Sequence, residues 1–239
     1  IKPHWPYIAP SPYHQLFRDL ELPSATRSEN ELKNPHPIYE AFTKIRVSRA
    51  FSKKEVRDRV LPTYFGLVKQ LDDHLGRLFQ FMKDQGSFEQ TLIVFTSDHG
   101  DYLGDHWLGE KDWFHEPSVK IPLIIRDPSS LANSSRGSRS TKLVESIDLV
   151  PTFIEALGGS FSDHILEGQS LKPFLHSEST KPIRECAISE YDYSVAPISS
   201  ILNPDPKKAR IYMVATKRWK YIYTVGYRPV LFDLQEDPM

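Results

Sequence analysis

Apolar side chains recur at three- and four-residue steps from about Lys54 onward, with charged residues between them. The set comprises Val60, Tyr64, Leu67, Val68, Leu71, Leu75, Leu78, Phe79 and Met82. This period is that of a helix with one apolar face. The pattern therefore predicts a long amphipathic helix that ends at Gly86, with Pro62 either kinking it or marking its first turn.

Two short apolar runs follow, at residues 91–96 and 121–125. Neither alternates with polar residues, and the first is rich in β-branched side chains. Such runs are typical of strands that are buried on both faces of a parallel sheet. A helix followed by a buried strand predicts an α/β fold with a mainly parallel sheet flanked by helices.

The remaining pattern is more local. Prolines interrupt the first fifty residues, so we expect loops with short helical turns there. Ser146 or Asp148 can cap a helix that runs to Leu157. Residues 210–225 predict a hairpin, part of a small antiparallel C-terminal element. We expect residues 1–180 to belong to the α/β domain and residues 181–239 to this smaller element.

The composition of the chain narrows the range of possible functions. The 239 residues carry a formal net charge of -1, which gives no global field for nucleic acid or an anionic membrane. No apolar run has the length of a membrane span. The single cysteine, Cys186, cannot form an internal disulfide, and we interpret it as a small buried apolar residue. The oligomeric state is open, a homo-oligomer included.

The densest chemistry lies at residues 97–101, directly after the first apolar run. Asp98 and His99 are adjacent, and Gly100 allows the backbone to turn closely. Ligands of α/β proteins bind at the carboxyl ends of strands, so this pair can form half of a metal site. The alternative is a capping aspartate beside a loop histidine. Further titratable and aromatic residues follow within the same loop, which favours a site.

Five landmarks resemble the sulfatase family, and most closely its bacterial phosphonate monoester hydrolase branch. They stand in the family's order and cover nearly the whole chain: Lys2-Pro3-His4-Trp5-Pro6-Tyr7, Thr96-Ser97-Asp98-His99-Gly100-Asp101-Tyr102-Leu103-Gly104-Asp105-His106, Asp148-Leu149-Val150-Pro151-Thr152, Glu167-Gly168-Gln169-Ser170-Leu171 and Leu231-Phe232-Asp233-Leu234-Gln235-Glu236-Asp237-Pro238. The resemblance implies an alkaline-phosphatase-like fold and the hydrolysis of sulfate, phosphate or phosphonate esters at a divalent metal. It places the protein in the bacterial cytoplasm or periplasm.

Carried over by position, the resemblance assigns five site residues. Asp98 and His99 become metal ligands, and Lys111 becomes the cation that contacts the anionic oxygens of the substrate. His4 becomes the acid beside the leaving oxygen, a task that suits an imidazole near neutral pH. Lys2 becomes a second substrate-binding cation. For both lysines the alternative is a solvated side chain.

The same resemblance implies cofactors. The family nucleophile is a formylglycine made from a cysteine in a Cys-x-Pro-x-Arg setting, and Cys186 has neither that proline nor that arginine. We therefore expect this chain to be the half that lacks the nucleophile, with formylglycine in the missing N-terminal half. Ca²⁺, Mg²⁺, Mn²⁺ and Zn²⁺ are all compatible with an Asp/His pair. Asp105, His106, His115 and Glu116 are expected either to hydrogen-bond to the ligands or to have a structural role in the loop.

The main hypothesis is a metal-dependent hydrolase whose partner is a small sulfate or phosphonate ester. One alternative is a phosphoryl transferase or phosphodiesterase of the same superfamily, with a threonine or serine nucleophile. Another is a module that binds a partner through its aromatic N-terminal loops and has no catalytic role.

Overall fold

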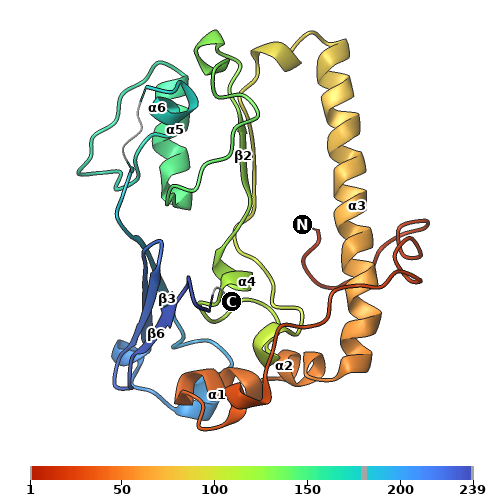
Figure 1. Cartoon of the computed structure of the whole chain (residues 1–239), viewed down its shortest axis with the longest axis vertical. Coiled ribbons are helices and arrows are strands. Elements are labelled where there is room, and N and C mark those ends of the chain that lie inside the picture. Colours follow the sequence, from red (N-terminus) through yellow and green to blue (C-terminus); the bar gives the residue numbers. More distant parts are fainter. Residues whose placement is uncertain (1, 179–181, 238–239) are drawn as a thin grey trace. The chain divides into compact units, whose positions relative to one another are not determined.

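The computed structural model describes residues 2–178 and 182–237 (Figure 1). The chain divides into two compact units. One takes the chain up to Glu89, then His99–Lys120 and Ala196–Asn203, whereas the other takes Gln90–Asp98, Ile121–Val195 and the chain from Pro204. The predicted boundary between residues 180 and 181 lies outside the described residues. No helix in the described ranges is long and apolar enough to cross a membrane.

The first unit is helical. Its helices are α1 (Pro37–Lys44), α2 (Arg46–Phe51), α3 (Lys54–Asp84), α4 (Glu116–Val119) and α7 (Ser199–Leu202). The long helix predicted from the apolar period is confirmed as α3, and Pro62 lies inside it, so the first-turn alternative is wrong. Buried Phe51, Leu61 and Leu103 form a core where α2, α3 and the loop after β1 meet.

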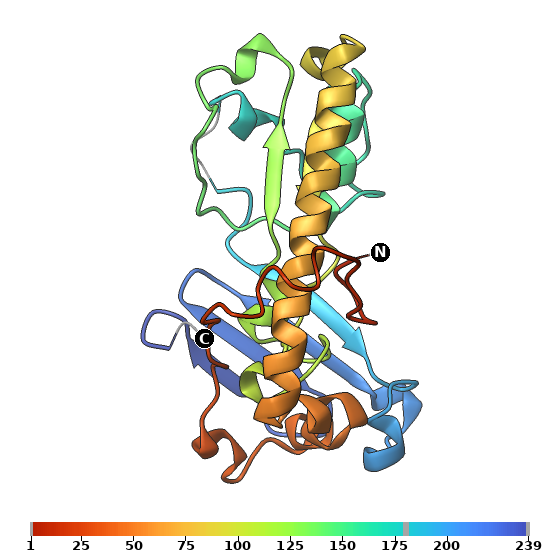
Figure 2. The ribbon, with the colours of Figure 1, turned by 90° about the vertical axis from the view of Figure 1, so that its right-hand side faces the viewer.

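The N-terminal segment crosses α3, as both ribbon views show (Figures 1 and 2). Gly66 permits this crossing, because a Cβ atom there would lie 2.3 Å from the carbonyl oxygen of Tyr13. Any larger residue would push the segment off the helix. The hydroxyl of Tyr13 also donates to Asp73 Oδ2 of α3 at 2.9 Å. These two contacts hold the segment against α3 at Tyr13.

The second unit holds the strands and two helices. Its elements are β1 (Ile93–Thr96), β2 (Leu123–Arg126), α5 (Leu149–Ala156), α6 (Lys172–Leu175), β3 (Ala187–Asp192), β4 (Arg210–Ala215), β5 (Trp219–Thr224) and β6 (Val230–Asp233). The helix predicted after Asp148 is confirmed as α5, and the hairpin predicted at residues 210–225 is confirmed as β4 and β5. The last four strands form one antiparallel sheet in the order β3-β4-β5-β6.

The predicted mainly parallel sheet is not confirmed. Strand β1 pairs with β2 in the antiparallel sense, with Ile93 opposite Arg126 and Thr96 opposite Leu123. Both strands are half-buried, and Ile124 is 64% exposed. An apolar run predicts a strand without specifying the direction of its neighbour, so the pattern alone does not decide between a parallel and an antiparallel partner. The α/β character itself is present.

Candidate active site

The loop after β1 makes a close turn at Gly100. A Cβ atom at this position would lie 1.9 Å from the carbonyl oxygen of Pro117, and the Gly100 amide donates to the Ser118 carbonyl at 2.8 Å. Only glycine fits so close an approach of two backbones. The turn brings the start of the loop beside α4, which follows Lys111 in the chain.

His99 has a defined tautomer. Its Nδ1 lies 2.7 Å from the Gly100 carbonyl oxygen, and a carbonyl can only accept a hydrogen bond. The proton therefore sits on Nδ1 and the lone pair on Nε2, which is how a metal-ligating histidine is held. Asp98, its neighbour in the chain, is exposed and ends the stretch Gln90–Asp98 of the second unit, whereas His99 belongs to the first. The donor types thus fit a divalent cation.

A complete metal site is not present among the described residues. Within residues 2–178 and 182–237, no group of three or more histidine, cysteine, aspartate or glutamate side chains is arranged to hold a metal ion. Asp98 and His99 therefore need further ligands to complete a coordination sphere. Cys186 is a free thiol of intermediate burial, so it is less enclosed than the sequence predicted.

His4 and Lys111 face each other although they are far apart in the sequence. Lys111 Nζ lies 3.5 Å from His4 Nε2. The other ring nitrogen, Nδ1, lies 2.8 Å from the Trp5 carbonyl oxygen, so it carries the proton and Nε2 faces the ammonium group. The ring centroids of His4 and His99 are 6.3 Å apart. Three of the five predicted residues therefore lie together in one unit.

Lys2 has a local partner. Its ammonium donates to the Pro6 carbonyl at 2.5 Å, and the Ile8 amide donates to the same oxygen at 2.8 Å. These bonds fold the segment around His4 back on itself. Lys2 therefore acts on the shape of this segment in the structure, and its predicted contact with substrate stays a prediction.

Asp101 is a site residue that the sequence analysis did not single out. Its Oδ2 accepts from the Tyr7 hydroxyl at 2.6 Å, and its Oδ1 accepts from the Leu103 amide at 3.1 Å. Burial raises the pKa of Asp101, while these bonds and one from the Glu110 amide oppose that shift. Burial and the facing carboxylate raise the pKa of Tyr7 above its usual range, so its hydroxyl stays protonated. The carboxylate at the end of the Asp-His-Gly-Asp string was the available signal.

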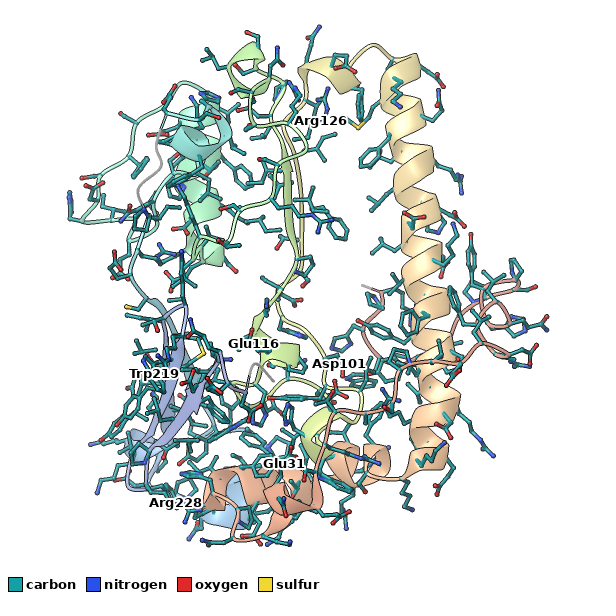
Figure 3. The ribbon with its side chains drawn as sticks, viewed as in Figure 1. Glu31, Asp101, Glu116, Arg126, Trp219 and Arg228 are labelled. Atoms are coloured by element: carbon teal, nitrogen blue, oxygen red, sulfur yellow. The ribbon has the colours of Figure 1, made fainter. Side chains whose placement is uncertain are left out.

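The loop that leads to Lys111 is backed by buried rings. Tyr102 is 1% exposed, and its hydroxyl accepts from the His115 amide at 3.1 Å. His106 and His115 stack with their ring centroids 3.9 Å apart. Both histidines are buried, as a supporting role requires. His106 Nδ1 lies 3.3 Å from Glu31 Oε1, which ties this loop to the segment before α1 (Figure 3).

Comparison with family models identifies the chain. The model described as sulfatase matches residues 1–160, and the model described as N-sulphoglucosamine sulphohydrolase, C-terminal, matches residues 104–239. The first match alone spans more than half of the chain. The second takes in the antiparallel C-terminal sheet.

Similar proteins point the same way. A multifunctional alkaline phosphatase superfamily protein, PehA of Trinickia caryophylli, is 33% identical over 99% of this chain and 48% of its own length. Arylsulfatase K of Xenopus laevis is 31% identical over 87% of this chain and 38% of its own length. The chain thus spans about half, or less, of the curated relatives it matches.

Solved structures share the fold. The phosphonate monoester hydrolase of Silicibacter pomeroyi superposes with a TM-score of 0.87 at 28% identity, over 99% of this chain and 49% of that chain. The phosphonate monoester hydrolase of Agrobacterium radiobacter gives a TM-score of 0.86 at 27% identity, over 100% of this chain and 50% of that chain. Together with the family match across residues 1–160, these similarities show that the chain belongs to the sulfatase family.

Proposed function

We propose that this chain supplies the acid and anion-binding half of an active site that hydrolyses monoesters of sulfate or phosphonate. The approach of Lys111 Nζ to within 3.5 Å of His4 Nε2 carries the proposal. An ammonium group and an imidazole that converge from distant parts of a chain form a natural site for an anionic group. The family membership and the names of the relatives support the same chemistry.

In the proposed reaction Lys111 contacts the nonbridging oxygens of the sulfuryl or phosphoryl group. Charge builds on the leaving oxygen as its bond to sulfur or phosphorus breaks, and a fixed ammonium stabilises that charge without reorganising. With Nδ1 fixed by the Trp5 carbonyl, Nε2 is the ring nitrogen of His4 that faces the reacting group. The protonated ring gives its Nε2 proton to the leaving oxygen, which departs as the alcohol.

Asp98 and His99 are assigned to a divalent metal. When bound, such a metal supplies Lewis-acid stabilisation of the nonbridging oxygens. The tautomer of His99 supports this assignment, since its lone pair is on Nε2. The nucleophile, a formylglycine, and the other metal ligands are assigned to parts of the protein outside this chain.

Membership of the family also supports a proposal about the fold of the whole protein. We assign to the whole protein a mainly parallel sheet, of which β1 is one strand, and a C-terminal element that begins near residue 181. The strong structural match to phosphonate monoester hydrolases over half of their length supports such an extension.

The test is the rate of His4→Ala in the full-length enzyme on esters of graded leaving-group pKa. A poor alkyl leaving group needs the proton, so kcat should fall about 10²–10⁴-fold, whereas a nitrophenyl ester should lose little. His74→Ala is the control, because His74 is exposed on α3 and contacts Gln70 at 3.4 Å. An equal loss on both classes of ester would show that His4 does not act as the acid.

A further inference from the structure

A hydrogen bond between two partly buried side chains links the N-terminal segment to the loop that leads to Lys111. The Tyr7 hydroxyl donates to Asp101 Oδ2 at 2.6 Å. Tyr7 follows His4 closely in the chain, and Asp101 stands at the start of the loop. Figure 3 shows Asp101 beside the segment that crosses α3. This bond therefore joins the two parts of the chain that bring His4 and Lys111 together.

The Tyr7 end of the bond is anchored by packing. The Tyr7 ring meets the Phe51 ring edge-on at a centroid distance of 6.0 Å and the Tyr64 ring at 6.3 Å. These side chains belong to or pack against the core at Phe51, Leu61 and Leu103. The ring is thus held by α2 and α3, and its hydroxyl is aimed at the carboxylate. Removing the hydroxyl alone leaves this packing in place.

The Asp101 end is anchored to the backbone of the loop. Besides Tyr7, the carboxylate accepts from the Leu103 amide at 3.1 Å, and the Tyr102 amide, next in the chain to Asp101, donates to the Glu110 carbonyl at 2.9 Å. Leu103 and Glu110 both have a positive φ, 47° for Leu103 and 62° for Glu110, a conformation that costs energy for side chains of this kind. Glu110 directly precedes Lys111. The bonds of Asp101 and the neighbouring backbone bond to Glu110 therefore together hold the loop from which Lys111 extends.

We propose that Tyr7 and Asp101 are positioning residues that set the approach of His4 to Lys111. The inference rests on the proposed function, since it assigns these two residues to the assembly of that site. Neither residue touches the substrate in this assignment. Tyr7 fixes the segment that bears His4, Asp101 fixes the loop that bears Lys111, and the bond between them fixes one relative to the other.

The decisive variant is Tyr7→Phe in the full-length enzyme. A misplacement of about 1 Å can cost about a hundredfold in rate, so we expect kcat on poor alkyl leaving groups to fall about 10–100-fold with little change in KM. Nitrophenyl esters should lose much less, because they do not need the proton. The slope of log kcat against leaving-group pKa should therefore lie between those of wild type and His4→Ala.

Tyr13→Phe is the matched control. It also removes one tyrosine hydroxyl that donates to an aspartate, Asp73, but that bond ties the segment to the outside of α3 rather than to the loop. Its slope should equal that of wild type. A purely structural role of Tyr7 would give the two variants the same slope and a similar loss of stability, and this result overturns the proposal.

A second pair of variants tests whether the two residues act as a unit. In an Asp101→Ala background, Tyr7→Phe should add no further loss of kcat, because the bond is already absent. Additive losses overturn the proposal.

If His4→Ala leaves the slope unchanged, the acid role of His4 is refuted, and the positioning role of Tyr7 and Asp101 needs a separate measurement. The distance between Nε2 of residue 4 and Nζ of residue 111 in a crystal structure of Tyr7→Phe then decides the positioning role: an unchanged 3.5 Å overturns it, and a clear separation supports it.

Discussion

Replacing Asp148 with alanine should destabilise the second unit strongly. The side chain is 0% exposed, and both of its oxygens accept from the Arg184 guanidinium, at 2.8 Å and 2.6 Å. The amides of Glu145 and Gln169 donate to the same carboxylate at 2.8 Å and 2.9 Å. One carboxylate therefore joins the start of α5 to two segments that are distant in the sequence.

The expected loss is several kcal/mol. Breaking a buried ion pair by removing one partner costs about 3–5 kcal/mol. Arg184 is 11% exposed and keeps a second partner, Glu145 Oε2, at 2.6 Å. The free-energy cost of breaking the Arg184–Asp148 pair should therefore lie near the lower end of this range. Two amides also lose their acceptor, at about 1 kcal/mol each. We therefore expect a total of about 4–5 kcal/mol.

Urea denaturation of the full-length enzyme measures this loss. With a slope of about 2 kcal/mol per molar urea, the midpoint of the second unit should fall by about 2 M. Asp192→Ala is the control, because Asp192 is 44% exposed and pairs with Arg210 at 2.7 Å. Such surface pairs contribute about 0–1 kcal/mol. Equal shifts in the two variants would refute the argument that burial decides the cost.

Two further predictions concern the first unit. Lys111→Ala should lower kcat about a hundredfold and raise KM much less, because the charge that the ammonium offsets is larger in the transition state; steady-state kinetics in which KM alone rises would make Lys111 a binding residue. Burial raises the pKa of Asp105, so its contribution to stability is full below the ordinary carboxyl pKa and is lost as pH rises through the raised value. Asp105→Asn should therefore gain stability relative to wild type as pH rises from below the ordinary carboxyl pKa through the raised value, and melting curves with a constant difference across that rise would contradict the assignment.

Local patterns in the sequence were sufficient for several elements. The apolar period of α3 is set by side chains within the helix. In the hairpin, buried positions alternate with partly buried ones along β4 and with exposed ones along β5. Asp148 directly precedes α5, but the predicted capping bond is absent: its side chain makes no capping hydrogen bond to this helix, and its carboxylate accepts from Arg184 instead. Such helices and hairpins can be predicted from residue spacing, because the residues that define them lie within a few helical turns or within one pair of adjacent strands.

Contacts between residues that are distant in the sequence could not be predicted from local patterns. The direction of the β1–β2 pair depends on the path of the chain between the strands, and an apolar run does not record that path. The Tyr7–Asp101 bond joins residues separated by most of the first unit. No spacing marks Tyr7, and the place of Asp101 at the end of the Asp-His-Gly-Asp string does not identify Tyr7 as its partner, because only the fold brings the two together.

The candidate site likewise contains residues that local sequence can suggest and residues that only the fold brings together. Asp98 and His99 are adjacent, so a short string of sequence can suggest them as a pair of ligands. His4 and Lys111 become neighbours only because the loop before Lys111 takes an unusual path, with Leu103, His106 and Glu110 all at positive φ. A sequence without glycine at these positions predicts ordinary conformations for them. Burial of Tyr102 and His106 and the hydrogen bonds to Asp101 offset the strain, so the position of Lys111 is decided by tertiary contacts.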